Sequence, residues 1–144
     1  MNLLKKPFLN ENEVQDLIPQ GTPFVMVDKM HYYSEDKVIS GFTIPKENIL
    51  NSNTLFTASG LIENMAQTVA LHTGYQYFLK NEPAPTGYIG AIKKVEIIGL
   101  PKITDTLKTT VNILHEIMGF TIVKSQVECN GKVIATSEMK TVLA

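Results

Sequence analysis

The segment Leu55-Phe-Thr-Ala-Ser-Gly-Leu-Ile-Glu-Asn-Met-Ala-Gln-Thr-Val-Ala-Leu-His-Thr-Gly-Tyr75 carries a single charged side chain. From Asn48 to Leu79 the only Asp, Glu, Lys or Arg is Glu63. Interior β-branched residues are few, and the pattern predicts a helix over about Leu55–Lys80. Its apolar residues cover most of the helix circumference, which is typical of a buried helix.

Glu63 is the residue of this helix that needs an explanation. A carboxylate is costly to remove from water unless it is paired, hydrogen-bonded or protonated. A reaction site is one explanation, and a hydrogen bond to a backbone group or a nearby lysine is the other. Gln67 follows four residues later and shares a face with Glu63. It is expected to hydrogen-bond the carboxylate or, alternatively, a backbone group in the core.

The rest of the sequence predicts an antiparallel sheet around the long helix. A short helix is expected at Asn10–Ile18, with Asn10 or Asn12 as its cap. The expected strands are Phe24–Tyr33, Lys37–Ile44, Tyr88–Ile98, Thr106–Ile117, Phe120–Cys129 and Lys132–Val142. This order indicates an α+β fold with one long helix covered by an antiparallel sheet. Because the helix is apolar all round, we expect the sheet to curl around it.

The composition is that of an ordinary globular protein, and we expect a single domain over residues 1–144. The chain has 44% hydrophobic and 19% charged residues and a formal net charge of −1. It therefore has no overall attraction to nucleic acid or to an anionic membrane. The single cysteine, Cys129, excludes an intramolecular disulfide and indicates no metal cluster. Because the sequence has no signal-peptide pattern and no transmembrane segment, we expect a soluble, cytoplasmic protein. We also expect that the protein binds neither a metal nor a cofactor.

Several motifs, in register, carry a family resemblance. Leu17-Ile-Pro-Gln-Gly-Thr-Pro-Phe-Val-Met-Val-Asp28 resembles the L-P-H-x-x-P-F-x-x-V-D opening of 3-hydroxyacyl-acyl-carrier-protein dehydratases, which have the hot-dog fold. Glu63-Asn-Met-Ala-Gln67 is similar to their E-x-M-A-Q helix motif. Tyr88-Ile-Gly-Ala, Gly99-Leu-Pro and Asn130-Gly131 follow in the family's order. Within the family, the chain most resembles the divergent dehydratase-like proteins of aryl polyene and related pigment pathways.

The resemblance implies the chemistry of a lyase in fatty acid or polyene synthesis. The substrate would be a 3-hydroxyacyl thioester of an acyl-carrier protein or coenzyme A, and the reaction would remove water from it. This reaction needs a base for the α-proton and an acid for the departing hydroxyl. The family's dehydratases use a histidine from a G-H-F-P-G loop and an acidic helix residue, which meet across a dimer interface. Glu63 falls at the acidic position, and Gly60 lies in the first helical turns, where backbone N–H groups bind the thioester carbonyl.

The family's catalytic histidine has no counterpart in this chain. Counting back from Glu63 places Ile49 at that position, and the other frequent family histidine, in L-P-H, is Gln20. His72 is nine residues beyond Glu63 and lies roughly on the opposite helix face. We expect an acyl-thioester pocket between two subunits, at the start of the helix and the loop Asn48–Thr54. The residues expected to contact substrate there are Gly60, Ile49, Asn51, Asn53, Asn64 and Gln67.

Four functions remain open on this reading. The first is an active dehydratase in which Glu63 works with a different base. The second is a catalytically silent subunit that binds the acyl thioester and pairs with an active homologue, where Glu63 completes a shared site. The third is a hot-dog thioesterase in which Glu63 activates water beside Gln67 or Asn64, and the fourth is a structural role for Glu63. The functional alternatives imply a homodimer or a heterodimer with another hot-dog subunit.

Overall fold

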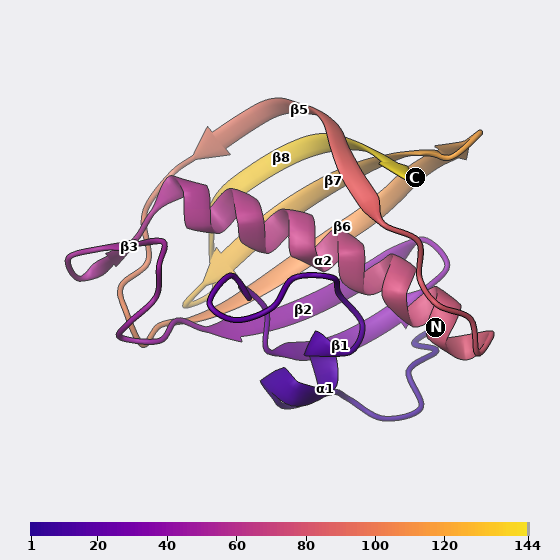
Figure 1. Ribbon diagram of the computed structural model, residues 1–144. Helices are drawn as coiled ribbons and strands as arrows, with labels where there is room; N and C mark the ends of the chain where they lie inside the picture. The colour runs from indigo at the N-terminus through magenta and orange to yellow at the C-terminus, as the bar shows by residue number, and fades with distance from the viewer. Residues whose placement is uncertain (144) are drawn as a thin grey trace.

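The computed structural model describes residues 1–143. Its elements are α1 (Glu11–Gln15), β1 (Lys29–Ser34), β2 (Lys37–Thr43), β3 (Asn51–Ser52), β4 (Leu55–Phe56), α2 (Ala58–Leu79), β5 (Gly87–Ile97), β6 (Thr106–Ile117), β7 (Phe120–Cys129) and β8 (Lys132–Leu143). The six long strands form one antiparallel sheet in the order β1-β2-β6-β7-β8-β5. The sheet curves around α2 (Figure 1). The predicted hot-dog architecture is confirmed.

Helix α2 begins three residues later than predicted. Leu55 and Phe56 pair with Asn51 and Ser52 as the short ladder β3–β4, which holds this segment extended. The helix then begins after Thr57, whose side-chain oxygen accepts a hydrogen bond from the backbone N–H of Gly60. In residues 1–143, neither helix is long and apolar enough to span a membrane.

Two glycines allow neighbouring groups to approach α2 closely. A Cβ atom on Gly60 would lie 2.5 Å from the ring of Phe56, which is fully buried. A Cβ atom on Gly74 would overlap the backbone oxygen of Leu17. Gly74 therefore permits the chain around Leu17 to pack directly on the helix, and this contact helps to form the candidate site.

The N-terminal part of the fold differs from the prediction in two elements. Asn10 caps α1 as expected, but the helix ends at Gln15 instead of Ile18. The predicted strand Phe24–Tyr33 is shortened, because β1 begins at Lys29. The segment before it has other hydrogen-bond partners: side chains of α2 bond the backbone groups of Phe24 and Met26. Those groups are satisfied without a neighbouring strand.

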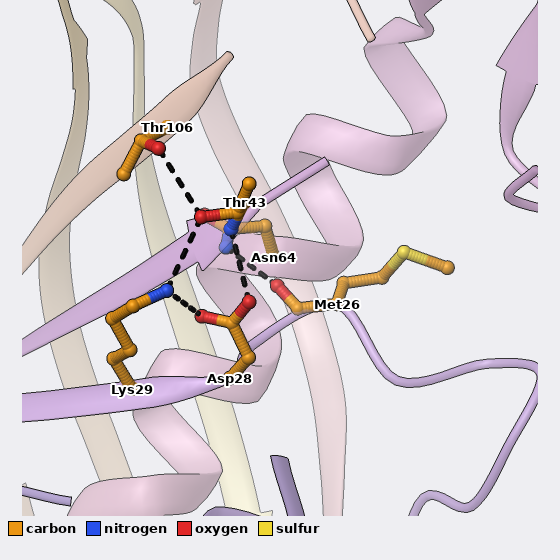
Figure 2. A network of polar contacts seen from close by, with 6 residues as sticks. All are labelled: Met26, Asp28, Lys29, Thr43, Asn64 and Thr106. Atoms are coloured by element: carbon orange, nitrogen blue, oxygen red, sulfur yellow. Dashed lines mark hydrogen bonds and ion pairs between the residues drawn. The ribbon is translucent and has the colours of Figure 1, made fainter. Parts of the chain in front are cut away.

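The aspartate of the opening motif holds the end of the sheet together (Figure 2). Oδ2 of Asp28 accepts a hydrogen bond from the backbone N–H of Thr43 at 3.1 Å, and Oδ1 pairs with Nζ of Lys29 at 2.8 Å. Nζ of Lys29 also donates to Oγ1 of Thr43 at 3.2 Å, and this hydroxyl lies 3.1 Å from Oγ1 of Thr106. The network links the ends of β1, β2 and β6, so Asp28 has a structural role.

The two hairpins on the C-terminal side match the sequence prediction closely. Strands β6 and β7 have the predicted bounds, and β8 extends one residue beyond the prediction. Met118 and Gly119 have φ values of 52° and 82°, and Asn130 and Gly131 have 54° and 77°. Positive φ at both central residues is the requirement of a type I′ turn, which suits the twist of an antiparallel pair.

Candidate functional site

A cavity of about 290 Å³ lies along α2 and contains Glu63. Its helical side is formed by Glu63 together with Ala66, Ala70 and Gly74, which recur about once per turn. Their small side chains leave space beside the helix. The other sides come from the segment Leu17–Gln20, the start of β5 and the end of β8. The Glu63 carboxyl therefore lies in a largely apolar cavity, and we call it the Glu63 cavity.

The carboxylate of Glu63 is held by the amide of Gln67. Nε2 of Gln67 donates to Oε1 of Glu63 at 2.8 Å and to the backbone oxygen of Phe24 at 2.7 Å. Oε1 of Gln67 accepts from the backbone N–H of Met26 at 2.7 Å. Because Met26 contributes a donor, the amide can have only one orientation, and its NH₂ group faces Glu63. Within residues 1–143, Oε2 of Glu63 has no hydrogen-bond partner, so this oxygen is available to a ligand.

Gln20 lines this cavity but was not among the predicted site residues. It lies in the segment that packs on Gly74, and its side chain lines the cavity with Glu63. Its Oε1 is buried without a hydrogen-bond partner in the described part of the chain. A buried acceptor without a partner costs about 1–3 kcal/mol. The sequence did contain a signal for Gln20, because this residue stands where the 3-hydroxyacyl-acyl-carrier-protein dehydratases frequently have a histidine.

None of the three predicted substrate-binding residues of α2 lines the cavity, although Gln67 contacts Glu63, which does. The N–H of Gly60 donates to the capping hydroxyl of Thr57 at 3.3 Å. Asn64 is fully buried on the sheet side of the helix. Its Nδ2 donates to the backbone oxygen of Met26 at 2.7 Å, and its Oδ1 accepts from Oγ1 of Thr109 at 2.6 Å. Both residues thus have structural partners, and only Gln67 among the predicted binding residues contacts Glu63.

The loop Asn48–Thr54 does not line the Glu63 cavity of its own chain. Ile49 is 51% exposed. The Nδ2 atom of Asn51 donates to the backbone oxygens of Pro45 and Lys46 at 3.0 and 3.3 Å. Asn53 has a φ of 56° and forms part of the turn between β3 and β4. A contact between this loop and the substrate would therefore have to form across a subunit interface, and it stays a prediction.

None of the three histidines lines the Glu63 cavity. His72 is 3% exposed and donates from Nε2 to the backbone oxygen of Ser34 at 2.9 Å. Its ring lies 5.0 Å from that of Tyr33, and burial lowers the pKa of His72 below 6.5. His31 and His115 lie on the surface of β1 and β6. The cavity thus has a carboxyl group and, within residues 1–143, no histidine beside it.

One wall of the cavity is also an edge of the sheet. Strand β5 is the last in the strand order and has a hydrogen-bonded neighbour, β8, on one side. Its first residues, Gly87, Tyr88 and Ile89, line the cavity, and Tyr88 is 61% exposed. Ile92 and Val95 continue the row of exposed apolar side chains. A strand that paired with this edge would also cover the side of the cavity.

Comparisons with known proteins agree with this architecture. Residues 12–144 match the family model named ApeP-like, described as ApeP dehydratase. The structure is similar to a chain of the dehydratase heterocomplex ApeI:P from Xenorhabdus doucetiae, with a TM-score of 0.82 and 21% identity over 91% of this chain and 90% of that chain. No curated protein matches the sequence.

Two further solved structures share the fold at lower sequence identity. The uncharacterized protein PH1136 from Pyrococcus horikoshii has a TM-score of 0.68 and 15% identity over 90% of this chain and 92% of that chain. A hypothetical thioesterase from Streptococcus pneumoniae, solved with coenzyme A, has a TM-score of 0.64 and 10% identity over 80% and 84% of the two chains. At these identities the similarity shows the hot-dog fold and leaves the activity to be argued from the site.

Proposed function

Because the chain belongs to the ApeP-like dehydratase family, we propose that it is one subunit of a two-subunit hot-dog dehydratase. In this proposal the pair removes water from a 3-hydroxyacyl thioester of fatty acid or polyene synthesis. The thioester carrier is an acyl-carrier protein or coenzyme A. One observation carries the proposal: the cavity holds an oriented carboxyl group, that of Glu63, and no histidine from residues 1–143 lies beside it.

The proposed reaction divides proton transfer between two chains. A histidine of the partner subunit removes the α-proton, the bond between C3 and its hydroxyl breaks, and Glu63 protonates the departing hydroxyl as water. The product is the enoyl thioester. Since Gln67 donates to Oε1 of Glu63, the transferred proton belongs on Oε2. Gln67 is a positioning residue in this scheme, because it holds the carboxyl group and transfers no proton itself.

The partner is proposed to bind at the free edge of β5. Backbone groups of an edge strand are available to a strand from another chain, and exposed apolar side chains add buried area on association. The first residues of β5 line the cavity beside Glu63. A subunit bound there would therefore reach the reacting atoms. The solved ApeI:P structure, a heterocomplex of dehydratase chains, supports a pairing of two hot-dog subunits.

A reconstitution experiment tests this function. The purified chain is assayed alone and together with a hot-dog subunit from the same genome that carries a G-H-F-P-G loop. The substrate is a 3-hydroxyacyl-pantetheine thioester, and mass spectrometry detects the loss of water. The proposal expects dehydration by the mixture at a rate well above that of either subunit alone. Dehydration by this chain alone, or release of free thiol without loss of water, would contradict it.

A further inference from the structure

The outer edge of β1 is covered by N-terminal residues of the same chain. Strand β1 is the first in the strand order, and its neighbour on the inner side is β2. On the outer side, Met30 donates its backbone N–H to the oxygen of Phe8 at 2.8 Å and accepts from the N–H of Phe8 at 3.0 Å. The backbone N–H of Leu3 donates to the oxygen of Tyr33 at 2.6 Å. Residues 2–8 therefore take the place of a neighbouring strand, and we call them the N-terminal strap.

The side chain of Asn2 completes this cover of the β1 edge. Its Oδ1 accepts from the backbone N–H of Tyr33 at 3.1 Å, and its Nδ2 donates to the backbone oxygen of His31 at 3.1 Å. The same Oδ1 accepts from the backbone N–H of Leu4 at 3.0 Å, which fixes the amide within the strap. Unpaired backbone groups at a sheet edge are the groups to which a strand of another chain binds. Those of Met30, His31 and Tyr33 that the strap bonds are not available to another strand.

Phe8 anchors the end of the strap on helix α2. Its ring centroid lies 5.8 Å from that of Tyr75 and 6.4 Å from that of Phe78, and both pairs meet edge to face. Leu4 and Phe8 are half-buried and pack against the hydrophobic core. The strap is thus held by packing as well as by hydrogen bonds, and Phe8 contributes to both.

The two edges of the sheet are therefore unequal. Strand β5 has β8 on one side and, in residues 1–143, no strand on the other. It carries exposed apolar side chains, among them Tyr88 and Ile89. If the β1 edge were also open, it would be free to pair with the β5 edge of another copy. Such a head-to-tail contact uses two different surfaces and adds further copies unless the assembly closes into a ring.

We propose that the N-terminal strap limits assembly to a pair by closing the β1 edge against the β5 edge of a second copy of this chain. The second copy is the occupant that an open β1 edge would take, because its β5 edge is open and apolar. With β1 covered, each chain presents a single edge to another chain. The inference concerns assembly and does not depend on the reaction proposed above.

Full-length variants that release the strap test this inference. Asn2→Ala combined with Phe8→Asp removes the amide that bonds Tyr33 and places a charge between aromatic rings. We expect hydrogen exchange at the amides of Met30 and Tyr33 to become at least about tenfold faster. In sedimentation velocity, the parent chain should not exceed the mass of a pair, whereas the variant should form larger species that grow with protein concentration. Lys5→Ala combined with Lys6→Ala is the matched control, because both lysines are exposed within the strap and should leave exchange and mass unchanged.

One further change separates pairing of sheet edges from aggregation of an unfolded chain. Ile92→Asp, added to the strap variant, places a charge on β5. It should return the assembly to no more than a pair while the amides of Met30 and Tyr33 still exchange fast. Growth that persists with Ile92→Asp would overturn the inference, and so would a released strap without growth or a parent chain that itself exceeds a pair. Unchanged exchange in the strap variant would also overturn it, because the contacts of Asn2 and Phe8 would then not hold the strap.

Discussion

Gln67 donates from Nε2 to Oε1 of Glu63 at 2.8 Å, and its own carbonyl oxygen is fixed by the backbone N–H of Met26. The same amide therefore ties α2 to the segment before β1 and orients the carboxyl group in the cavity. Since Gln67 is fully buried, its orientation is determined by the folded structure before any ligand binds. The position of the candidate acid is thus a consequence of how the fold satisfies its backbone groups.

Replacement of Gln67 should destabilise the protein as well as release Glu63. Gln67→Met keeps the approximate shape of the side chain but leaves the backbone N–H of Met26 and the backbone oxygen of Phe24 without partners. We expect the free energy of unfolding to fall by about 2–4 kcal/mol, measured by urea denaturation. The matched control is Gln76→Met on the same helix, which should change the free energy by less than about 0.5 kcal/mol. Equal effects of the two changes would show that Gln67 is not a structural link.

Replacement of Gly60 or Gly74 by alanine should lower the free energy of unfolding by different amounts. Gly60→Ala forces the Cβ atom against the ring of Phe56, and we expect a loss of about 1–3 kcal/mol in the free energy of unfolding. The second change Phe56→Leu shortens that neighbour and should recover part of the loss. Gly74→Ala meets the backbone of Leu17 instead, so the loss should be larger. A Gly74→Ala variant as stable as the parent protein would contradict the packing described for the cavity wall.

His72 should make the stability depend on pH. Burial lowers its pKa in the folded state below 6.5, and the hydrogen bond to Ser34 opposes this only in part. As the pH falls below 6.5, the unfolded chain takes up a proton that the folded chain does not. The free energy of unfolding should therefore decrease with falling pH, by up to about 1.4 kcal/mol per pH unit.

The change His72→Gln should remove this part of the pH dependence. Urea denaturation at about pH 7.5 and about pH 5.5 gives the difference in unfolding free energy for each variant. His115→Gln is the control, because His115 is exposed on β6 and should leave the pH dependence of the parent protein unchanged. If the unfolding free energy of His72→Gln has the same pH dependence as that of the parent protein, then burial does not keep His72 neutral in the folded state.

A charge on the outer strand should weaken association with the partner subunit. Ile92 is 39% exposed on β5 and does not line the Glu63 cavity, so Ile92→Asp introduces a charge at the edge without altering that site. We expect the dissociation constant of the pair to rise at least tenfold, measured by light scattering after size exclusion. Leu9→Asp is the control, because Leu9 is 60% exposed and far along the chain from β5. An equal increase in the dissociation constant for Ile92→Asp and Leu9→Asp would show that the subunit interface does not lie at the β5 edge.

Most of the fold was predictable because its signals are local. Strands β6 and β7 alternate along the sequence and are joined by residues that adopt positive φ, and their bounds agree with the prediction. The segment Phe24–Asp28 was wrongly assigned to a strand. The backbone oxygen of Phe24 and both backbone groups of Met26 bond side chains 38 to 43 residues later, on α2. No pattern within the segment itself indicates such partners.

The site was predictable only in part. Glu63 and Gln67 were selected because a lone carboxylate in an apolar helix has a high cost of burial, and the structure places them in contact. Asn64 was selected as a polar side chain able to bind a substrate hydroxyl or carbonyl, yet its face of the helix points to the sheet. The cavity itself arises where Ala70 and Gly74 face a segment and a strand that are distant in sequence. Helical periodicity predicts on which face of α2 each residue lies. It does not predict which face borders a cavity.

The rate of dehydration by the mixture of this chain with a histidine-bearing hot-dog subunit tests the role of Glu63 most directly. Glu63→Gln keeps the shape of the side chain and removes its acid. We expect the rate of water loss from the 3-hydroxyacyl thioester to fall at least about a hundredfold, while the affinity of the two subunits stays unchanged. A mixture containing Glu63→Gln that dehydrates the substrate at the parent rate would show that this carboxyl group takes no part in the reaction.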